Sequence, residues 1–473
     1  MPALLPYSST AAHPAKGSKG GSFIPHAAIV MSARWARAEE YSTDEALRVA
    51  RFLGATDIAW HYLTRGPRLA VAARAQGLRV NCALPSNTRM VKSACMDVRT
   101  GKPTELHGID GVYNPDTNSA SFRNEVSDYL REAKETGCTS LQQDDPFFMY
   151  YRRDQGCYGD VSPAQVKMAV KNYYGWLHSA VRRTYGHQVP ITYNKKFHAT
   201  DESKSPLNEL ARYFTGAMAE VEENQNTPGR LYDTIHRINE LRLHLPTVTT
   251  LISESILQNR RHIAAVYALG GHPIFPWDVF LRQGDRMYGD ISDYTGYYQP
   301  VKEHPELFNG MGVMDTVINH APERVSSRLG LKLTGDSSDL LVVLKGRRGS
   351  PEVLHLVNWR GARRTVTVRL PRAMAGGLKN FIMVVPNKAP VALPLKRQSE
   401  GIVEFDVPAL DVWAIVALSE HVADRDGLAS DPTRRDEHIA SDMDSIQGLA
   451  QAAGSRSTEG RVRVQEAGYQ RVE

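Results

Sequence analysis

Short apolar stretches alternate with amphipathic helical stretches over most of the first 300 residues. Helical stretches often end at a glycine, and an apolar strand then follows, which is the pattern of parallel α/β units. The predicted strands are residues 27–31, 57–62, 78–84, 138–141, 189–193, 213–219, 247–252 and 272–275. Eight strands alternating with helices over roughly 250 residues predict a (βα)8 TIM barrel.

Residues 85–118 interrupt this rhythm with a polar, turn-rich stretch. A connection of this length in a compact domain is usually functional or ordered by a ligand. Because it follows the third predicted strand, we expect it to lie over the mouth of the barrel.

The pattern changes after Phe308 to short strand-like runs separated by Gly, Pro, Asn and Asp, which predicts an all-β antiparallel sandwich. The fold class is therefore α/β, a (βα)8 barrel followed by a sandwich. The predicted boundaries are 1–26 for a flexible leader, 27–308 for the barrel, 309–325 for a linker, 326–420 for the sandwich and 421–473 for a disordered tail.

The composition of the chain argues against some classes of binding partner and bears on its compartment. The chain has 473 residues and a net charge of +5, and its charges are scattered, so nucleic acid is not an expected partner. No apolar run approaches the roughly 20 residues of a membrane helix. The leader has no continuous apolar segment typical of a secretion signal, so the cytoplasm is the default compartment. None of the four cysteines forms a Cys-x-x-Cys pair, and we interpret Cys82 and Cys138 as small core residues.

Candidate chemistry gathers where the predicted strands end, because the active sites of (βα)8 barrels lie at the C-terminal ends of their strands. Acidic and aromatic residues dominate these positions, whereas the strand bodies are mostly apolar. The candidates are Arg34, Trp35, His61, Tyr62, Asp144, Asp145, Asn194, Lys195, Glu220, Glu222, Glu254, Trp277 and Asp278. Pro146 directly after the two aspartates ends the fourth strand.

Two carboxylates flanking a scissile bond are the requirement of glycoside hydrolysis, and their separation decides between retention and inversion. Asp144, Asp145 and Glu220 are the catalytic candidates, and the remaining positions are predicted to bind the sugar. Such a site requires no cofactor and no metal. The alternative is a divalent metal held by Asp144, Glu220 and His61, although no typical ligand spacing supports it.

Several of these residues also have a purely structural interpretation. Trp35 and Trp277 would close the top of the barrel as core rings. Glu222 and Glu254 would stabilise the first turn or the cap of the helices that follow them.

Four motifs resemble those of glycoside hydrolases of the (βα)8 type with a C-terminal β-sandwich. They are Gln-Asp-Asp-Pro (143–146), Met-Ala-Glu (218–220), Gly-His-Pro-Ile-Phe-Pro-Trp-Asp (271–278) and His-Leu-Val-Asn-Trp (355–359). An aspartate after strand four paired with an acid after strand six is similar to the α-galactosidase-type arrangement, although the Lys-x-Asp motif of that group is absent. The resemblance implies that Asp144 or Asp145 is the nucleophile or base and Glu220 the general acid.

The sequence therefore predicts a glycosidase acting on an oligosaccharide or polysaccharide. Two other functions stay open at this point: a metal-dependent (βα)8 hydrolase or lyase, and a non-catalytic carbohydrate-binding protein built on a hydrolase-like barrel. The sequence does not indicate the sugar, the linkage or the oligomeric state.

Overall fold

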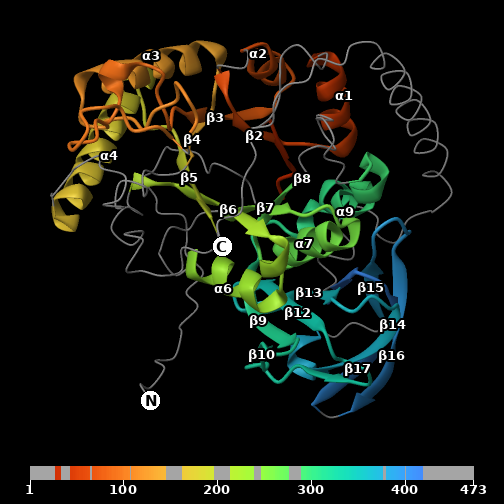
Figure 1. Cartoon of the computed structure of the whole chain (residues 1–473). Coiled ribbons are helices and arrows are strands. Elements are labelled where there is room, and N and C mark those ends of the chain that lie inside the picture. Colours follow the sequence, from red (N-terminus) through yellow and green to blue (C-terminus); the bar gives the residue numbers. More distant parts are fainter. Residues whose placement is uncertain are drawn as a thin grey trace, which may run out of the picture.

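A computed structural model of the chain contains a closed parallel barrel and a separate antiparallel β-domain, which confirms the predicted fold class (Figure 1). It describes residues 27–33, 43–63, 67–106, 108–144, 162–196, 213–238, 247–275, 289–375, 380–399 and 401–418. At some element ends within these ranges only the backbone is described.

The barrel closes in chain order, with each strand parallel to the next and the eighth strand paired with the first. The strands are β1 (Val30–Ser32), β2 (Asp57–His61), β3 (Arg79–Leu84), β4 (Ser140–Gln143), β5 (Ile191–Lys196), β6 (Gly216–Glu222), β7 (Thr247–Ile252) and β8 (His272–Phe275). Strands β5 and β6 extend beyond their predicted ends, because backbone pairing continues from Thr192↔Gly216 to Lys196↔Glu220. Asn194 and Glu220 consequently lie within strands rather than after them.

Helices cover the outside of the barrel (Figure 1). Those described are α1 (Thr43–Leu53), α2 (Arg68–Ala75), α3 (Ala120–Thr136), α4 (Pro163–Tyr185), α6 (Pro228–Ile238), α7 (Ile256–Ala268) and α9 (Ile291–Glu303). Helix α4 begins as its sequence predicts, with the Ser162 hydroxyl accepting a hydrogen bond from the Gln165 backbone N–H (3.3 Å) and Pro163 in the first turn. None of the described helices is long and apolar enough to cross a membrane.

The second domain is a ten-stranded antiparallel sheet that folds over a core of its own. Its strands are β9 (Gly312–Asn319), β10 (Arg324–Val325), β11 (Lys332–Thr334), β12 (Leu340–Arg347), β13 (Ser350–Asn358), β14 (Arg364–Pro371), β15 (Asn380–Val384), β16 (Val391–Ser399), β17 (Ile402–Leu410) and β18 (Trp413–Ala417). Residues 309–325, which we predicted as a linker, contain β9 and β10, and β9 pairs with β12 along most of its length.

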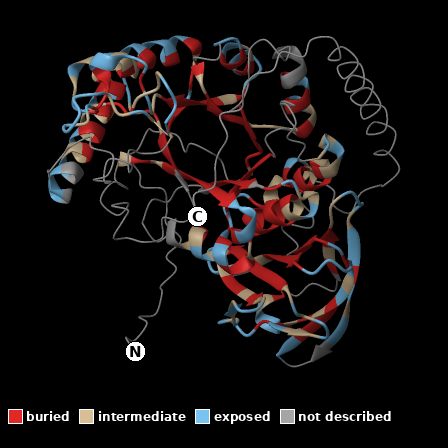
Figure 2. Cartoon of the chain, viewed as in Figure 1, coloured by how far each residue is buried: buried red, intermediate tan, exposed pale blue. Residues whose placement is uncertain are grey.

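The central strands of this sheet are buried on both faces (Figure 2). Along β12, Leu340 and Val342 belong to the core between the two halves of the sheet, whereas Leu341 and Val343 belong to the core shared with the barrel. Helix α7 of the barrel packs on β12 and β13. Burial on both faces explains why these strands have continuous apolar sequences rather than alternating ones.

Two titratable side chains are buried where the sheet meets the barrel. Lys345 is 2% exposed, and its Nζ donates a hydrogen bond to the backbone carbonyl of Tyr267 on α7 (3.2 Å). His355 is fully buried, with its ring stacked on Trp413 at a centroid distance of 6.0 Å. Burial lowers the pKa of Lys345 to about 8, and burial together with the nearby Lys345 charge lowers the pKa of His355. The protonated lysine therefore carries a desolvation cost in the folded state.

We expect this cost to make stability depend on pH. Between the folded pKa of about 8 and the unfolded value of 10.5, the unfolded chain binds more protons, so the free energy of unfolding rises with pH. A Lys345→Met variant lacks this contribution. From pH 8 to pH 9.5, the free energy of unfolding of the parent should therefore rise relative to that of the variant by between about 1 and 2 kcal/mol. Denaturant titrations across this range measure the difference, with the exposed Lys388→Met as the matched control. A pH-independent difference for Lys345→Met would contradict the assignment.

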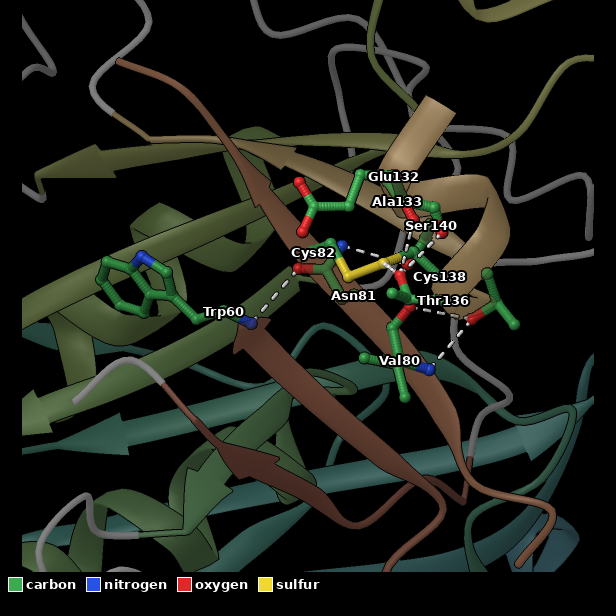
Figure 3. Close-up of a disulfide and its surroundings, with 10 residues drawn as sticks. Trp60, Val80, Asn81, Cys82, Glu132, Ala133, Thr136, Cys138 and Ser140 are labelled. Carbon is green, nitrogen blue, oxygen red and sulfur yellow. Dashed lines mark hydrogen bonds between the residues drawn. A yellow bond between two sulfur atoms is a disulfide. The ribbon is translucent and has the colours of Figure 1, made fainter. Parts of the chain in front are cut away.

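A disulfide joins Cys82 on β3 to Cys138, two residues before β4 (Figure 3). Both residues are buried, as we predicted, but interpreting them only as small core side chains was wrong, because they are covalently linked. Cys95 is also disulfide-bonded. The Cys82–Cys138 bond links the middle of β3 to the segment just before β4, and β4 leads directly to Asp144.

Candidate active site at the barrel mouth

Three polar side chains at the mouth ends of β4, β5 and β6 lie on the inner face of the barrel. Side chains alternate between the two faces of a strand. Tyr193 belongs to the outer core beneath the helices, which places its neighbour Asn194 inside. Met218 belongs to the small cluster that fills the barrel, so Glu220, two residues further along β6, also points inward. Asp144 directly follows β4 and lies within hydrogen-bonding distance of Asn194.

The amide group of Asn194 bridges the carboxylates of Asp144 and Glu220. Its Nδ2 lies 2.8 Å from Asp144 Oδ1 and 2.9 Å from Glu220 Oε1. Both partners are carboxylate oxygens, so the amide must present its two N–H donors to them, which fixes the orientation of the amide. Asn194 and Glu220 are each only 6% exposed, so the bridge is largely shielded from solvent.

The shared nitrogen also limits the separation of the two acids. Since both oxygens contact it, Asp144 Oδ1 and Glu220 Oε1 lie no more than about 5.7 Å apart. This is nearer to the ~5–5.5 Å between the carboxyl groups of retaining glycosidases than to the ~6.5–9.5 Å of inverting ones.

Asp144 accepts a second hydrogen bond from Tyr62, which follows β2. The Tyr62 hydroxyl lies 2.6 Å from Asp144 Oδ2, and the indole Nε1 of Trp60 donates to the same hydroxyl at 3.1 Å. Hydrogen bonds to a carboxylate are short and strong because they are assisted by its charge. The Tyr62 and Asn194 side chains therefore hold both oxygens of Asp144 in a defined orientation.

The other described candidates lie around this group. His61 is buried at the end of β2, where its backbone pairs with Cys82. Glu222 is exposed at the end of β6, and its side chain caps the short 3-10 helix η6 (Glu223–Gln225). Glu254 is exposed after β7, and Ser255 rather than Glu254 provides the cap of α7. Glu222 and Glu254 thus occupy the rim of the mouth, and their predicted contact with sugar stays a prediction.

The remaining candidates fall on parts of the chain that the structure does not describe. They are Arg34, Trp35, Asp145, Trp277 and Asp278, together with the side chain of Lys195. Their predicted roles stay predictions.

Trp60 is a site residue that the sequence reasoning missed. Residues 57–62 include apolar side chains at both odd and even positions, so their order gives no sign of which ring turns inward. In the structure, both Ala59 and Trp60 belong to the cluster inside the barrel, which is possible because β2 carries an irregularity in register between Ile58 and His61.

Among the side chains that the structure describes, no three His, Cys, Asp or Glu residues are grouped so that they could hold a metal ion. Asp144, Glu220 and His61 therefore do not form the metal site considered as an alternative.

Comparison with known proteins finds no matching family model and no curated protein with significant sequence similarity. Solved structures do match. The crystal structure of the cycloisomaltooligosaccharide glucanotransferase from Paenibacillus sp., complexed with cycloisomaltoheptaose, has a TM-score of 0.61 at 9% identity, covering 82% of this chain and 85% of that chain. The α-amylase from H. orenii has a TM-score of 0.55 at 9% identity, covering 84% of this chain and 100% of that chain. The debranching enzyme from Nostoc punctiforme has a TM-score of 0.54 at 9% identity, covering 83% and 99%.

These matches cover more than four fifths of this chain, and at this identity they show a shared fold.

Proposed function

We propose that this protein is a glycoside hydrolase in which Asp144 is the nucleophile and Glu220 the general acid and base. The observation that carries the proposal is the Asn194 bridge, which holds two carboxylates side by side at the mouth of the barrel. Two such groups flanking a glycosidic bond are sufficient for its hydrolysis without a cofactor. Fold alone does not determine function, so the proposal depends on these side chains rather than on the barrel.

The spacing favours a double displacement that retains the anomeric configuration. In the first step Glu220 protonates the glycosidic oxygen while an oxygen of Asp144 attacks the anomeric carbon, so the C–O bond to the leaving sugar breaks and a glycosyl ester forms. In the second step the Glu220 carboxylate removes a proton from water as the water oxygen attacks the same carbon. The ester breaks, the sugar leaves, and both carboxyl groups return to their initial states.

The assignment of roles follows from the hydrogen bonds. Asp144 accepts hydrogen bonds from Tyr62 and Asn194 on its two oxygens, which hold this side chain in one orientation for attack on the anomeric carbon. The same Asn194 amide holds Glu220 beside Asp144, so Glu220 takes the second of the two carboxylate roles, that of general acid and base.

The structural neighbours suggest the first substrates to test. One was crystallised with a cyclic isomalto-oligosaccharide, and another is an α-amylase. We therefore infer that an α-linked glucan is the substrate class with which to begin.

The test is a hydrolysis screen of the full chain on amylose, linear and cyclic isomalto-oligosaccharides, and a panel of β-linked glycans, with and without a chelator. Proton NMR during turnover identifies the anomer that is released first. We expect cleavage that is insensitive to the chelator and a product with the anomeric configuration of the substrate. Cleavage lost on chelation would overturn the proposal in favour of a metal-dependent enzyme. Binding without turnover would overturn it in favour of a carbohydrate-binding protein.

A further inference from the structure

Strand β2 contains a strained residue beside the proposed active site. Trp60 has a φ of +62°, a left-handed conformation that bulky residues rarely adopt. The register between β2 and β3 advances by three residues on β2, from Ile58 to His61, and by two on β3, from Val80 to Cys82. This is a β-bulge with one extra residue, a device that redirects side chains and is common beside active sites. Strain of this kind persists only where the surroundings stabilise it.

The surroundings of Trp60 hold both its backbone and its ring. Its backbone N–H donates to Asn81 Oδ1 (3.4 Å), and Asn81 Nδ2 donates in turn to Ser140 Oγ on β4 (3.0 Å) (Figure 3). The ring is fully buried inside the barrel, in a cluster that also contains Ala59 and Ala83. Regular alternation would turn only one of the neighbours Ala59 and Trp60 inward, so the bulge allows this large ring to face the interior as well.

The redirected ring connects to Asp144 through one hydroxyl group. Trp60 Nε1 donates to the Tyr62 oxygen (3.1 Å), and the Tyr62 hydroxyl donates to Asp144 Oδ2 (2.6 Å). An indole N–H can only donate, so it occupies a lone pair of the phenol oxygen and leaves the phenol proton for the carboxylate. Hydrogen bonds arranged in series also polarise one another.

We propose that Trp60 is a positioning residue, which acts through the Tyr62 hydroxyl to orient Asp144 for attack on the anomeric carbon. This inference rests on the proposed glycosidase function for the role of Asp144. The Trp60–Tyr62–Asp144 relay itself is a property of the folded chain and can be tested without any substrate.

The first test uses the indole N–H resonances of protein labelled with 15N-tryptophan, of which the chain has only six. The Trp60 resonance is assigned by its absence in Trp60→Phe, or in Trp60→Tyr if the phenylalanine variant does not fold. Tyr62→Phe should move this resonance because it removes the acceptor, and Asp144→Asn should move it because the change is transmitted through the hydroxyl. The matched control is Tyr193→Phe, which removes a buried hydroxyl on the outer face of β5. An unmoved Trp60 resonance in Tyr62→Phe would overturn the relay.

The second test is a double-mutant cycle on kcat/KM. Loss of a hydrogen bond to a charged group is worth about 1.5–3 kcal/mol, so Tyr62→Phe should lower kcat/KM by about 10- to 100-fold. Trp60→Phe should lower it less, and the double variant should match Tyr62→Phe alone, because Trp60 acts through the hydroxyl. Additive losses would overturn the positioning role and assign Trp60 to packing only. If the parent hydrolyses no glycan, the proposed function fails while the resonance test still decides the relay.

Discussion

Replacement of Asp144 by asparagine should lower the turnover of every glycoside substrate by at least about a thousandfold, which is the largest effect we expect of any single substitution. The amide keeps the size of the side chain and can still accept a hydrogen bond from Tyr62, but it cannot form the glycosyl ester. Its single oxygen cannot also accept from Asn194, which donates to the other oxygen of Asp144, so the variant keeps only one of these two hydrogen bonds. The unfolding temperature should therefore fall slightly, and the loss of kcat should persist at temperatures where the variant is fully folded.

Glu220→Gln should behave differently, since a general acid matters only when the leaving group needs a proton. On an oligosaccharide we expect a loss of about 10²- to 10⁴-fold. On an aryl glycoside with an acidic phenol as leaving group, formation of the glycosyl ester should be nearly unaffected, and its hydrolysis should become limiting. A burst of phenol followed by slow turnover is the measurement that separates Glu220 from Asp144.

Azide provides an independent check on the two roles. In Asp144→Ala, azide can take the place of the missing carboxylate and attack the anomeric carbon directly, giving a glycosyl azide of inverted configuration. In Glu220→Ala, azide attacks the glycosyl ester and gives the retained configuration. Asp128→Asn, on the exposed face of α3, is the matched control and should keep parental activity. Full activity of Glu220→Gln on oligosaccharides would contradict the assignment.

The positions of these acids could be predicted from sequence because the active sites of (βα)8 barrels lie at the C-terminal ends of the strands. Short apolar runs located β4 and β6, and a carboxylate at the end of each was sufficient to nominate Asp144 and Glu220. Asn194 was nominated because it follows the predicted fifth strand. Its role as a bridge could not be predicted, because the contact depends on the register Asn194↔Met218 between β5 and β6, which no local pattern encodes.

Two features were beyond sequence reasoning for different physical reasons. The bulge at Trp60 changes which side chains of β2 face inward. The order of apolar residues in β2 would be the same in a strand without a bulge, so it does not reveal this change. Strand β9 carries the polar residues Asp315 and Thr316 at buried positions, which interrupt its apolar sequence. In the structure, Asp315 accepts hydrogen bonds from the backbone N–H groups of Arg328 (3.0 Å) and Leu329 (3.1 Å), which satisfy its buried carboxylate.

The Cys82–Cys138 disulfide was missed because neither residue belongs to a recognisable cysteine motif. Disulfides are typical of proteins that fold in oxidising environments and are rare in the cytosol. The bond therefore argues for an oxidising compartment over the cytoplasmic default that the leader suggested. Both cysteines are at most 4% exposed, so a reductant would reach the bond mainly when this part of the barrel opens.

Removing this disulfide should lower the free energy of unfolding of the barrel by about 4 kcal/mol, because a cross-link over a loop of this length restricts the unfolded chain. The change to make is the double variant Cys82→Ala/Cys138→Ala, since a reductant would also act on the disulfide of Cys95. Guanidinium unfolding followed by circular dichroism measures the loss, and the parent under the same conditions without reductant is the reference. Adding a reductant should destabilise the parent and have a smaller effect on the variant. Equal midpoints for parent and variant would show that the bond does not constrain the unfolded chain. A lowered midpoint with parental kcat would show that the disulfide stabilises the barrel without orienting Asp144, which is consistent with an orientation set by the hydrogen bonds from Tyr62 and Asn194.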